Sequence, residues 1–170
     1  MSEPISANAV KELRDRSGAG IMECKRALED SGGNVEKALI VLRDQGFAKA
    51  EKRSDRATSQ GMVDCYIHGG GRIGALVEVN CETDFVGRTE DFKALAHDLA
   101  MQVAATNPRY LSAEDVPADE EGDPKEICLL EQAFIKNAGL SIRDLINATV
   151  SKTGEVVRVR RFARFELGGE

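Results

Sequence analysis

The sequence has few of the side chains that mark an enzyme or a metal protein. Among 170 residues it has no tryptophan, two tyrosines, six phenylalanines and two histidines. Its four cysteines include no C-x-x-C pair, the spacing of many zinc and thiol redox sites. We therefore expect no metal, no cofactor, and reduced, mostly buried thiols at Cys24, Cys65, Cys81 and Cys128.

Long apolar runs and an excess of positive charge are also missing. No segment nears the roughly 20 apolar residues that a membrane-spanning helix needs. Residues 1–4 lack the basic start of a secretory signal, and no apolar run follows them. We therefore expect a cytoplasmic protein without a membrane partner. The formal net charge of −6 disfavours direct binding of nucleic acid, because affinity for phosphates requires a basic surface.

Residues 1–47 predict a small bundle of three helices. Ser6 and Asn34 are good N-cap residues, and apolar side chains recur at helical spacing after each of them. Glycines separate the three segments, and Gly46 is expected to end the third helix. The apolar side chains that recur at helical spacing are Val10, Leu13, Ile21, Cys24, Ala27, Leu28, Val35, Ala38, Leu39 and Leu42.

The polar stretch 48–60 has little to bury and predicts a linker, in part helical. Residues 61–170 then predict a second domain of the α+β class. Segments 62–68 and 73–80 alternate apolar and polar side chains, as strands of a hairpin do. A helix over residues 89–105 is expected to pack its apolar stripe on that hairpin.

The rest of this domain predicts an acidic loop, two helices and a third strand. Residues 112–125 are rich in acidic residues, proline and glycine, which favours a loop. The helices are expected around residues 127–134 and after Ser141, which opens a capping-box-like start. The last strand, 156–167, changes its apolar parity near Arg160-Arg161, which predicts a β-bulge. The expected core is an antiparallel sheet of about three strands, packed with helices.

Gly69-Gly70-Gly71-Arg72-Ile73-Gly74 matches the G-x-G-x-x-G pattern of dinucleotide-binding folds. In those folds the glycines open a helix whose N-terminus receives the pyrophosphate. A strand follows here instead, so a hairpin turn is the better interpretation. Because the sequence also has no G-x-x-x-x-G-K-[ST] loop, we do not expect it to be a GTPase.

An enzyme is one alternative. His68 or His97 could form a nucleophilic dyad with a cysteine such as Cys65 or Cys81. No third orienting group or known signature accompanies them, so the residues favour a protein without covalent chemistry.

An RNA-binding sheet is a second alternative, because arginines alternate with phenylalanines near the C-terminus and such a pattern can bind single strands. The predicted bulge would split these side chains between two faces, and the acidic remainder of the chain would oppose a polyanion. A solvated sheet face is the simpler interpretation of Arg158, Arg160, Arg161, Phe162, Arg164 and Phe165.

Four stretches resemble the bacterial translation elongation factor Ts family. They are Val10–Leu28 (VKELRDRSGAGIMECKRAL), Glu78–Phe85 (EVNCETDF), Leu129–Gln132 (LLEQ) and Val159–Glu166 (VRRFARFE). Ser17 stands where the family commonly has threonine. The four matches occur in the family's order, and the resemblance extends along nearly the whole chain.

This resemblance implies a fold and a function. The fold is a ubiquitin-associated-like three-helix domain followed by a core with a small antiparallel sheet. The function is guanine-nucleotide exchange on the GTPase elongation factor Tu, without covalent chemistry. Such a factor binds the GDP form, loosens the magnesium and phosphate site, releases GDP, and leaves the nucleotide-free GTPase when GTP binds.

The resemblance also implies two groups of partner-binding residues. The family's Thr-Asp-Phe motif falls on Thr83, Asp84 and Phe85, followed by Val86, and would press into the GTPase near its magnesium site, with Phe85 as a wedge. On the residues alone, packing of Phe85 in the core beside Phe92 is the favoured interpretation. The N-terminal signature implies docking on the nucleotide-binding domain through Leu13, Arg14, Gly18, Ala19, Gly20, Ile21 and Met22.

The chain departs from the family in one place. Many members have a longer helical segment before Leu129–Gln132, where this sequence has the acidic residues 112–125. We do not expect the contacts of that segment here. Compact members similar to this chain are often dimeric, so a homodimer stays open beside a monomer.

Overall fold

The computed structural model describes residues 5–52 and 55–169. They form two compact units. One contains the described residues up to Arg56 and the segment Asn147–Val156; the other contains Ala57–Ile146 and the chain from Val157 onward. A segment near the C-terminus thus belongs to the N-terminal unit. The division into a domain at 1–47, a linker at 48–60 and a second domain at 61–170 stays a prediction.

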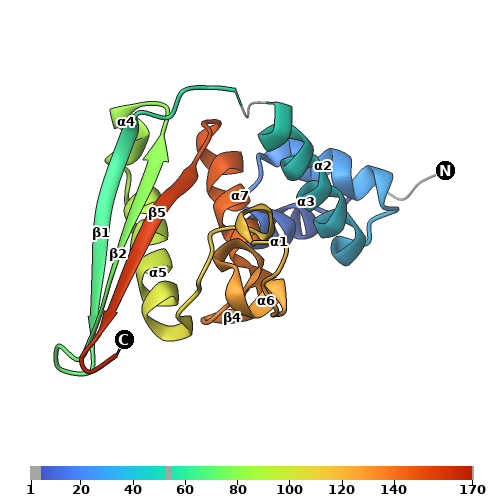
Figure 1. The fold of residues 1–170 in the computed structure, drawn as a ribbon. Coiled ribbons are helices and arrows are strands. Elements are labelled where there is room, and N and C mark those ends of the chain that lie inside the picture. The colour runs from blue at the N-terminus through green and yellow to red at the C-terminus, as the bar shows by residue number, and fades with distance from the viewer. Residues whose placement is uncertain (1–4, 53–54, 170) are drawn as a thin grey trace. The chain divides into compact units, whose positions relative to one another are not determined.

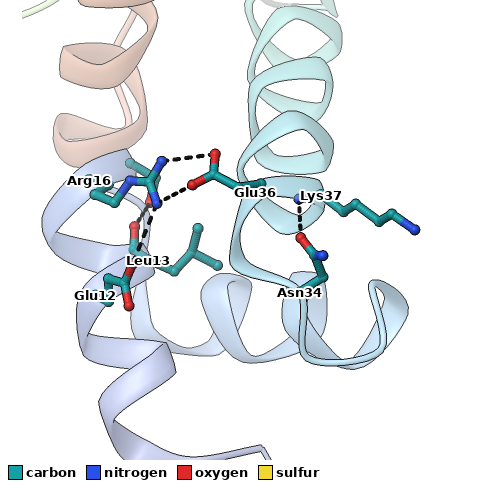
Figure 2. A network of polar contacts seen from close by, with 7 residues as sticks. Glu12, Leu13, Arg16, Asn34, Glu36 and Lys37 are labelled. Atoms are coloured by element: carbon teal, nitrogen blue, oxygen red, sulfur yellow. Dashed lines mark hydrogen bonds and ion pairs between the residues drawn. The ribbon is translucent and has the colours of Figure 1, made fainter.

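The N-terminal unit contains the three predicted helices, α1 (Ala7–Ser17), α2 (Ile21–Asp30) and α3 (Val35–Lys52). Both predicted N-caps are confirmed: the Ala9 N–H donates to Ser6 Oγ at 3.1 Å, and the Lys37 N–H donates to Asn34 Oδ1 at 2.9 Å (Figure 2). Gly18 ends α1 in the left-handed region, where a side chain is unfavourable. The buried core consists of Leu13, Ala19, Cys24, Ala27, Leu28, Ala38 and Leu42.

The predicted end of the third helix at Gly46 is wrong, because α3 continues to Lys52. A glycine inside a helix costs only about 1 kcal/mol relative to alanine. Gly46 is buried, and a Cβ built on it would lie 3.8 Å from Ser151 Oγ, so a neighbouring segment packs here. The first part of the predicted linker is therefore helical, and residues 53–54 lie outside the described residues.

The second unit contains the predicted three-stranded antiparallel sheet, ordered β1-β2-β5. Its strands are β1 (Gln60–His68), β2 (Ile73–Cys81) and β5 (Arg158–Glu166), and α5 (Glu90–Thr106) packs on one face (Figure 1). Val159 pairs with Val79 while Arg161 pairs with Glu78. Arg160 is the extra residue between them, so the predicted β-bulge is confirmed.

The two faces of this sheet differ in burial. Ala75, Val77 and Val79 are at most 2% exposed, and the stripe of α5 that begins at Phe92 is buried in the same unit. Alternation along the strands places the other side chains on the opposite face. That open face stays exposed and carries Val63, Cys65, Ile67, Leu76 and Phe165.

The helix predicted around residues 127–134 is wrong. The chain instead forms the short helices α6 (Pro124–Ile127) and η2 (Leu129–Glu131) and then a hairpin of β3 (Ala133–Phe134) and β4 (Asn137–Ser141). The next helix, α7 (Ile142–Thr153), begins after Ser141 as predicted. The fully buried Gln102 explains the extended backbone. It accepts from the Ile135 N–H at 2.9 Å and donates to the Ala133 carbonyl at 3.1 Å, so these groups need no helical partner.

In the part of the chain that the structure describes, no helix has both the length and the apolar character needed to cross a bilayer. Nor does any group of three His, Cys, Asp or Glu side chains there lie close enough to hold a metal ion. The cysteines are free thiols, buried at positions 24, 81 and 128 and exposed at position 65.

Candidate partner-binding site

Thr83, Asp84, Phe85 and Val86 lie at the corner where β2 ends and the short helix α4 (Asp84–Gly87) begins. The Val86 N–H donates to Thr83 Oγ1 at 3.4 Å, which caps this helix. Val86 is buried, whereas Phe85 is 78% exposed. The alternative in which Phe85 joins the core is therefore wrong; Phe92 is the buried phenylalanine, at 0% exposure.

The backbone of this corner is held by groups that sequence reasoning missed. The Cys81 thiol donates to the Thr83 carbonyl at 3.1 Å. A Cβ built on Gly87 would lie 3.4 Å from the Gly61 Cα, and one built on Gly61 would lie 2.1 Å from the Val79 carbonyl oxygen. Strand β1 therefore passes so close to the corner that a side chain at Gly61 cannot fit.

Asp84 and Arg88 form an ion pair beside Phe85. Arg88 Nη2 lies 2.9 Å from Asp84 Oδ2, and both side chains are well exposed. Solvent screens such a pair, so it holds the carboxylate only loosely. Together with Phe85 and Thr89, the two side chains line a shallow depression. An aromatic ring and a carboxylate thus project from one well-supported corner.

The predicted docking residues divide into exposed and buried groups. Ile21 and Met22, at the start of α2, are 58% and 63% exposed, and Arg14 is exposed on α1. Leu13 and Ala19 are 0% and 5% exposed and belong to the bundle core. Direct contact with a partner is therefore available to the first group, while Leu13 and Ala19 can only support the surface from beneath.

The loop of Gly18, Ala19 and Gly20 is held by side-chain hydrogen bonds. Ser17 Oγ donates to the Leu13 carbonyl at 2.6 Å and accepts from the Ala19 N–H at 3.2 Å. The Cys24 thiol donates to the Ala19 carbonyl at 3.7 Å. Burial raises the pKa of Cys24, an effect partly offset by its hydrogen bond with Ser17. This neutral thiol therefore acts as a structural group.

An ion-pair network joins α1 to α3 next to this loop. Figure 2 shows the Arg16 guanidinium between Glu12 and Glu36, with Arg16 Nη1 2.7 Å from Glu36 Oε1 and 3.4 Å from Glu12 Oε1. The hydrogen bond with Arg16 lowers the pKa of Glu36 and raises the pKa of Arg16. The network links α3 to the end of α1 from which the loop starts.

The arginines of β5 contact groups within the chain. Arg161 Nε lies 2.7 Å from Glu78 Oε2, and this hydrogen bond lowers the pKa of Glu78. Arg164 Nε donates to the Ala104 carbonyl at 3.0 Å, and its side chain is only 12% exposed. Arg160 Nε also lies 3.8 Å from Glu78 Oε1. Because these arginines contact groups within the chain, the structure disfavours a continuous RNA-binding surface on this strand.

Comparison with known proteins is consistent with this arrangement. A family model described as Elongation factor TS matches residues 49–123. Curated relatives named Elongation factor Ts align with 96% of this chain: that of Syntrophomonas wolfei is 51% identical with 91% of its length aligned, that of Desulfosudis oleivorans 50% with 98%, and that of Heliobacterium modesticaldum 49% with 90%.

Each of these alignments extends over 194 positions, although this chain has only 170 residues. The relatives therefore contain residues without a counterpart here, which is consistent with the short acidic segment expected to replace a longer one. About half of the aligned positions are identical along almost the whole length of both chains. This chain belongs to the elongation factor Ts family.

Proposed function

We propose that this chain is the guanine-nucleotide exchange factor for elongation factor Tu in cytoplasmic translation elongation. Phe85 is the observation that carries the proposal: it is 78% exposed although it is a large apolar side chain, and it lies beside Asp84 in the family's Thr-Asp-Phe motif. A buried phenylalanine contributes about 1.5–3 kcal/mol. Because Phe85 is exposed in the free chain, the free energy of burying its side chain can be gained when a partner binds.

The proposed mechanism is a competition between two ligands of one GTPase. Phe85 enters the GTPase near its magnesium site, and the Asp84 carboxylate brings negative charge toward the phosphates, which repel it. If the factor weakens GDP binding by some ratio, GDP must weaken binding of the factor by the same ratio. No bond is made or broken, and we therefore assign no catalytic residue.

Phe85 cannot supply the whole effect. Weakening a nucleotide about 10⁴-fold requires ~5.5 kcal/mol of differential binding, while one buried phenylalanine contributes ~1.5–3 kcal/mol. The rest of the interface, in the N-terminal domain and the C-terminal module, must contribute the remainder, and Ile21 and Met22, the docking surface, hold the complex together. Substitutions at Phe85 are thus expected to lower the GDP release rate, and substitutions at Ile21 or Met22 to lower the affinity for the GTPase.

A titration tests the competition itself. The affinity of the chain is measured for nucleotide-free and for GDP-bound elongation factor Tu. We expect much tighter binding to the nucleotide-free form. The ratio of these two affinities should equal the factor by which the chain lowers the affinity of the GTPase for GDP. Equal affinity for the two forms would exclude an exchange factor, because a ligand without differential affinity shifts no equilibrium.

Met22→Glu is expected to weaken docking by about tenfold or more, because it places a charge in a desolvated apolar contact. The bundle should stay folded, since Met22 is 63% exposed. The maximal GDP release rate at saturating factor should stay near the native value. Ile40→Glu is the matched control, because Ile40 is 57% exposed on α3; equal effects of the two variants would remove Met22 from the docking surface.

We also propose that two copies of the chain associate through the open face of the sheet. Five large apolar side chains there are 45–69% exposed, and exposed apolar patches of this kind commonly mark interfaces. Glu78 and Arg161, which share this face, neutralise each other. A patch of this kind can pair with its own copy about a twofold axis. It consists of Val63, Ile67, Leu76, Phe165 and Leu167.

Ile67→Asp is expected to convert a dimer into a monomer, because the substitution buries a carboxylate in the proposed interface. Ile67 is 63% exposed and lies on the edge strand β1, so the monomer should keep its melting temperature. Sedimentation across a range of protein concentrations checks this, with Ile40→Asp as the control. A native chain that stays monomeric at the highest concentration would contradict the proposal.

A further inference from the structure

Cys81 is the last residue of β2 and stands at the start of the corner that carries Phe85. Its side chain is 0% exposed, so it cannot touch a partner directly. The thiol instead donates to the Thr83 carbonyl at 3.1 Å. A Cβ built on Gly87 would lie 3.5 Å from the Cys81 Sγ. The sulfur therefore lies beside both ends of the four-residue helix α4.

The hydrogen bonds between Thr83 and α4 are long. The Thr83 carbonyl accepts the Gly87 N–H at 3.3 Å, and Thr83 Oγ1 accepts the Val86 N–H at 3.4 Å. The far side of α4 has a shorter bond, in which Thr89 Oγ1 donates to the Val86 carbonyl at 2.8 Å. A helix of four residues is too short to be stable alone in water. The orientation of Phe85 therefore depends on how firmly Thr83 is held.

We propose that Cys81 is a positioning residue for GDP release, because its thiol fixes the Thr83 carbonyl and thereby the orientation in which Phe85 meets the GTPase. The inference rests on the proposed function, since it names a residue that supports the same corner. A side chain that is already oriented loses less conformational freedom on binding. More of the free energy of burying Phe85 then remains for weakening GDP.

Packing alone is the competing explanation, because a buried cysteine can simply fill the core as a small apolar side chain. Cys81→Ala and Cys81→Ser separate the two roles. Alanine removes the donor and leaves a small space. Serine keeps an O–H group that can donate to the Thr83 carbonyl.

The first measurement is the maximal GDP release rate from elongation factor Tu at saturating factor. It is expected to fall about 3- to 10-fold in Cys81→Ala, the loss that one weak hydrogen bond can cause. Cys81→Ser should stay within about twofold of the native rate, because the donor is kept. The factor concentration that gives half of the maximal rate should change little in either variant, because Ile21 and Met22 are unchanged.

The second measurement needs no partner. Hydrogen exchange of the Val86 and Gly87 amides in the free chain, followed by NMR, shows how firmly Thr83 holds α4. These amides should exchange several-fold faster in Cys81→Ala than in the native chain. In Cys81→Ser they should exchange at nearly the native rate.

Cys128→Ala is the matched control, because Cys128 is also 0% exposed and belongs to the same unit. It pairs with Tyr110, which follows the C-terminus of α5, whereas Cys81 precedes the N-terminus of that helix. Each alanine variant removes one buried sulfur atom, so both should lower the melting temperature by a few degrees. Only Cys81→Ala should slow GDP release.

Three results would overturn the inference while the proposed function stands. One is a Cys81→Ala variant with the native maximal GDP release rate. Another is a Cys81→Ser variant that loses as much of this rate as Cys81→Ala, as a packing role predicts. The third is an equal loss in Cys128→Ala, as general destabilisation predicts. A native chain that does not accelerate GDP release at any concentration would instead overturn the proposed function, and the inference with it.

Discussion

Phe85→Ala is expected to slow GDP release from the saturated complex by about 10- to 100-fold. The substitution removes the free energy of burying one phenylalanine, about 1.5–3 kcal/mol, and each 1.4 kcal/mol in a barrier is about tenfold in rate. Docking should weaken much less, because Ile21 and Met22 remain in place. The folded structure should be retained, since Phe85 is 78% exposed.

Stopped-flow release of a fluorescent GDP analogue, over a range of factor concentrations, separates the two quantities. The maximal GDP release rate measures the effect of Phe85 within the complex. The factor concentration that gives half of this rate measures how tightly the factor docks. Ile135→Ala is the control, because it truncates an apolar side chain that is 42% exposed in the same unit. A Phe85→Ala variant with the native maximal rate and only a shifted half-maximum would show that Phe85 is a docking residue.

Gly61→Ala is expected to lower the melting temperature by about 10 °C. The new Cβ would lie 2.1 Å from the Val79 carbonyl oxygen, and Gly61 has a φ of 136°, so the backbone must move. The cost should lie at the upper end for point substitutions, near 4 kcal/mol, and a chain of this size loses roughly 2–4 °C for each kcal/mol. GDP exchange should fall as well, because the corner that carries Phe85 is displaced.

Gly70→Ala provides the comparison for this variant. Gly70 also has a positive φ, of 67°, but no atom lies within 4 Å of a Cβ built on it. It therefore tests backbone strain without the clash, and its melting temperature should fall by only a few degrees. Equal losses at the two positions would mean that the close approach of β1 to the corner does not constrain the fold.

Much of the fold could be predicted because its signals are local. The capping residues Ser6 and Asn34 marked helix starts, Gly18 marked an end, and the parity change near Arg160 marked the bulge. These features depend on a few neighbouring residues, whose chemistry can be read directly from the sequence. The α+β class and the small antiparallel sheet followed from them.

The errors arose where distant residues decide local structure. The segment predicted as a helix around residues 127–134 is extended because the buried amide of Gln102 supplies hydrogen-bond partners to its backbone. Gly46 lies inside α3, where the segment containing Ser151 packs against it. Neither partner is adjacent in sequence, so periodicity and propensity alone favoured the wrong structure.

The candidate site was predicted only in part. Asp84 and Phe85 were identified as site residues through the resemblance, whereas the residues alone favoured a buried Phe85, which is wrong because Phe85 is 78% exposed. Gly61 had no local signal, because its importance comes from the backbone of β2 that it approaches in the folded chain. Leu13 lies in a matched motif yet is fully buried, so the motif marks both the surface and its support.

We propose above all that this chain accelerates the loss of GDP from elongation factor Tu. The most direct test is the release rate of a fluorescent GDP analogue from the purified GTPase, measured with increasing amounts of the native chain. We expect a release rate that rises and saturates, with each molecule of the chain acting on many molecules of the GTPase. A release rate that stays at its spontaneous value at every concentration would contradict it.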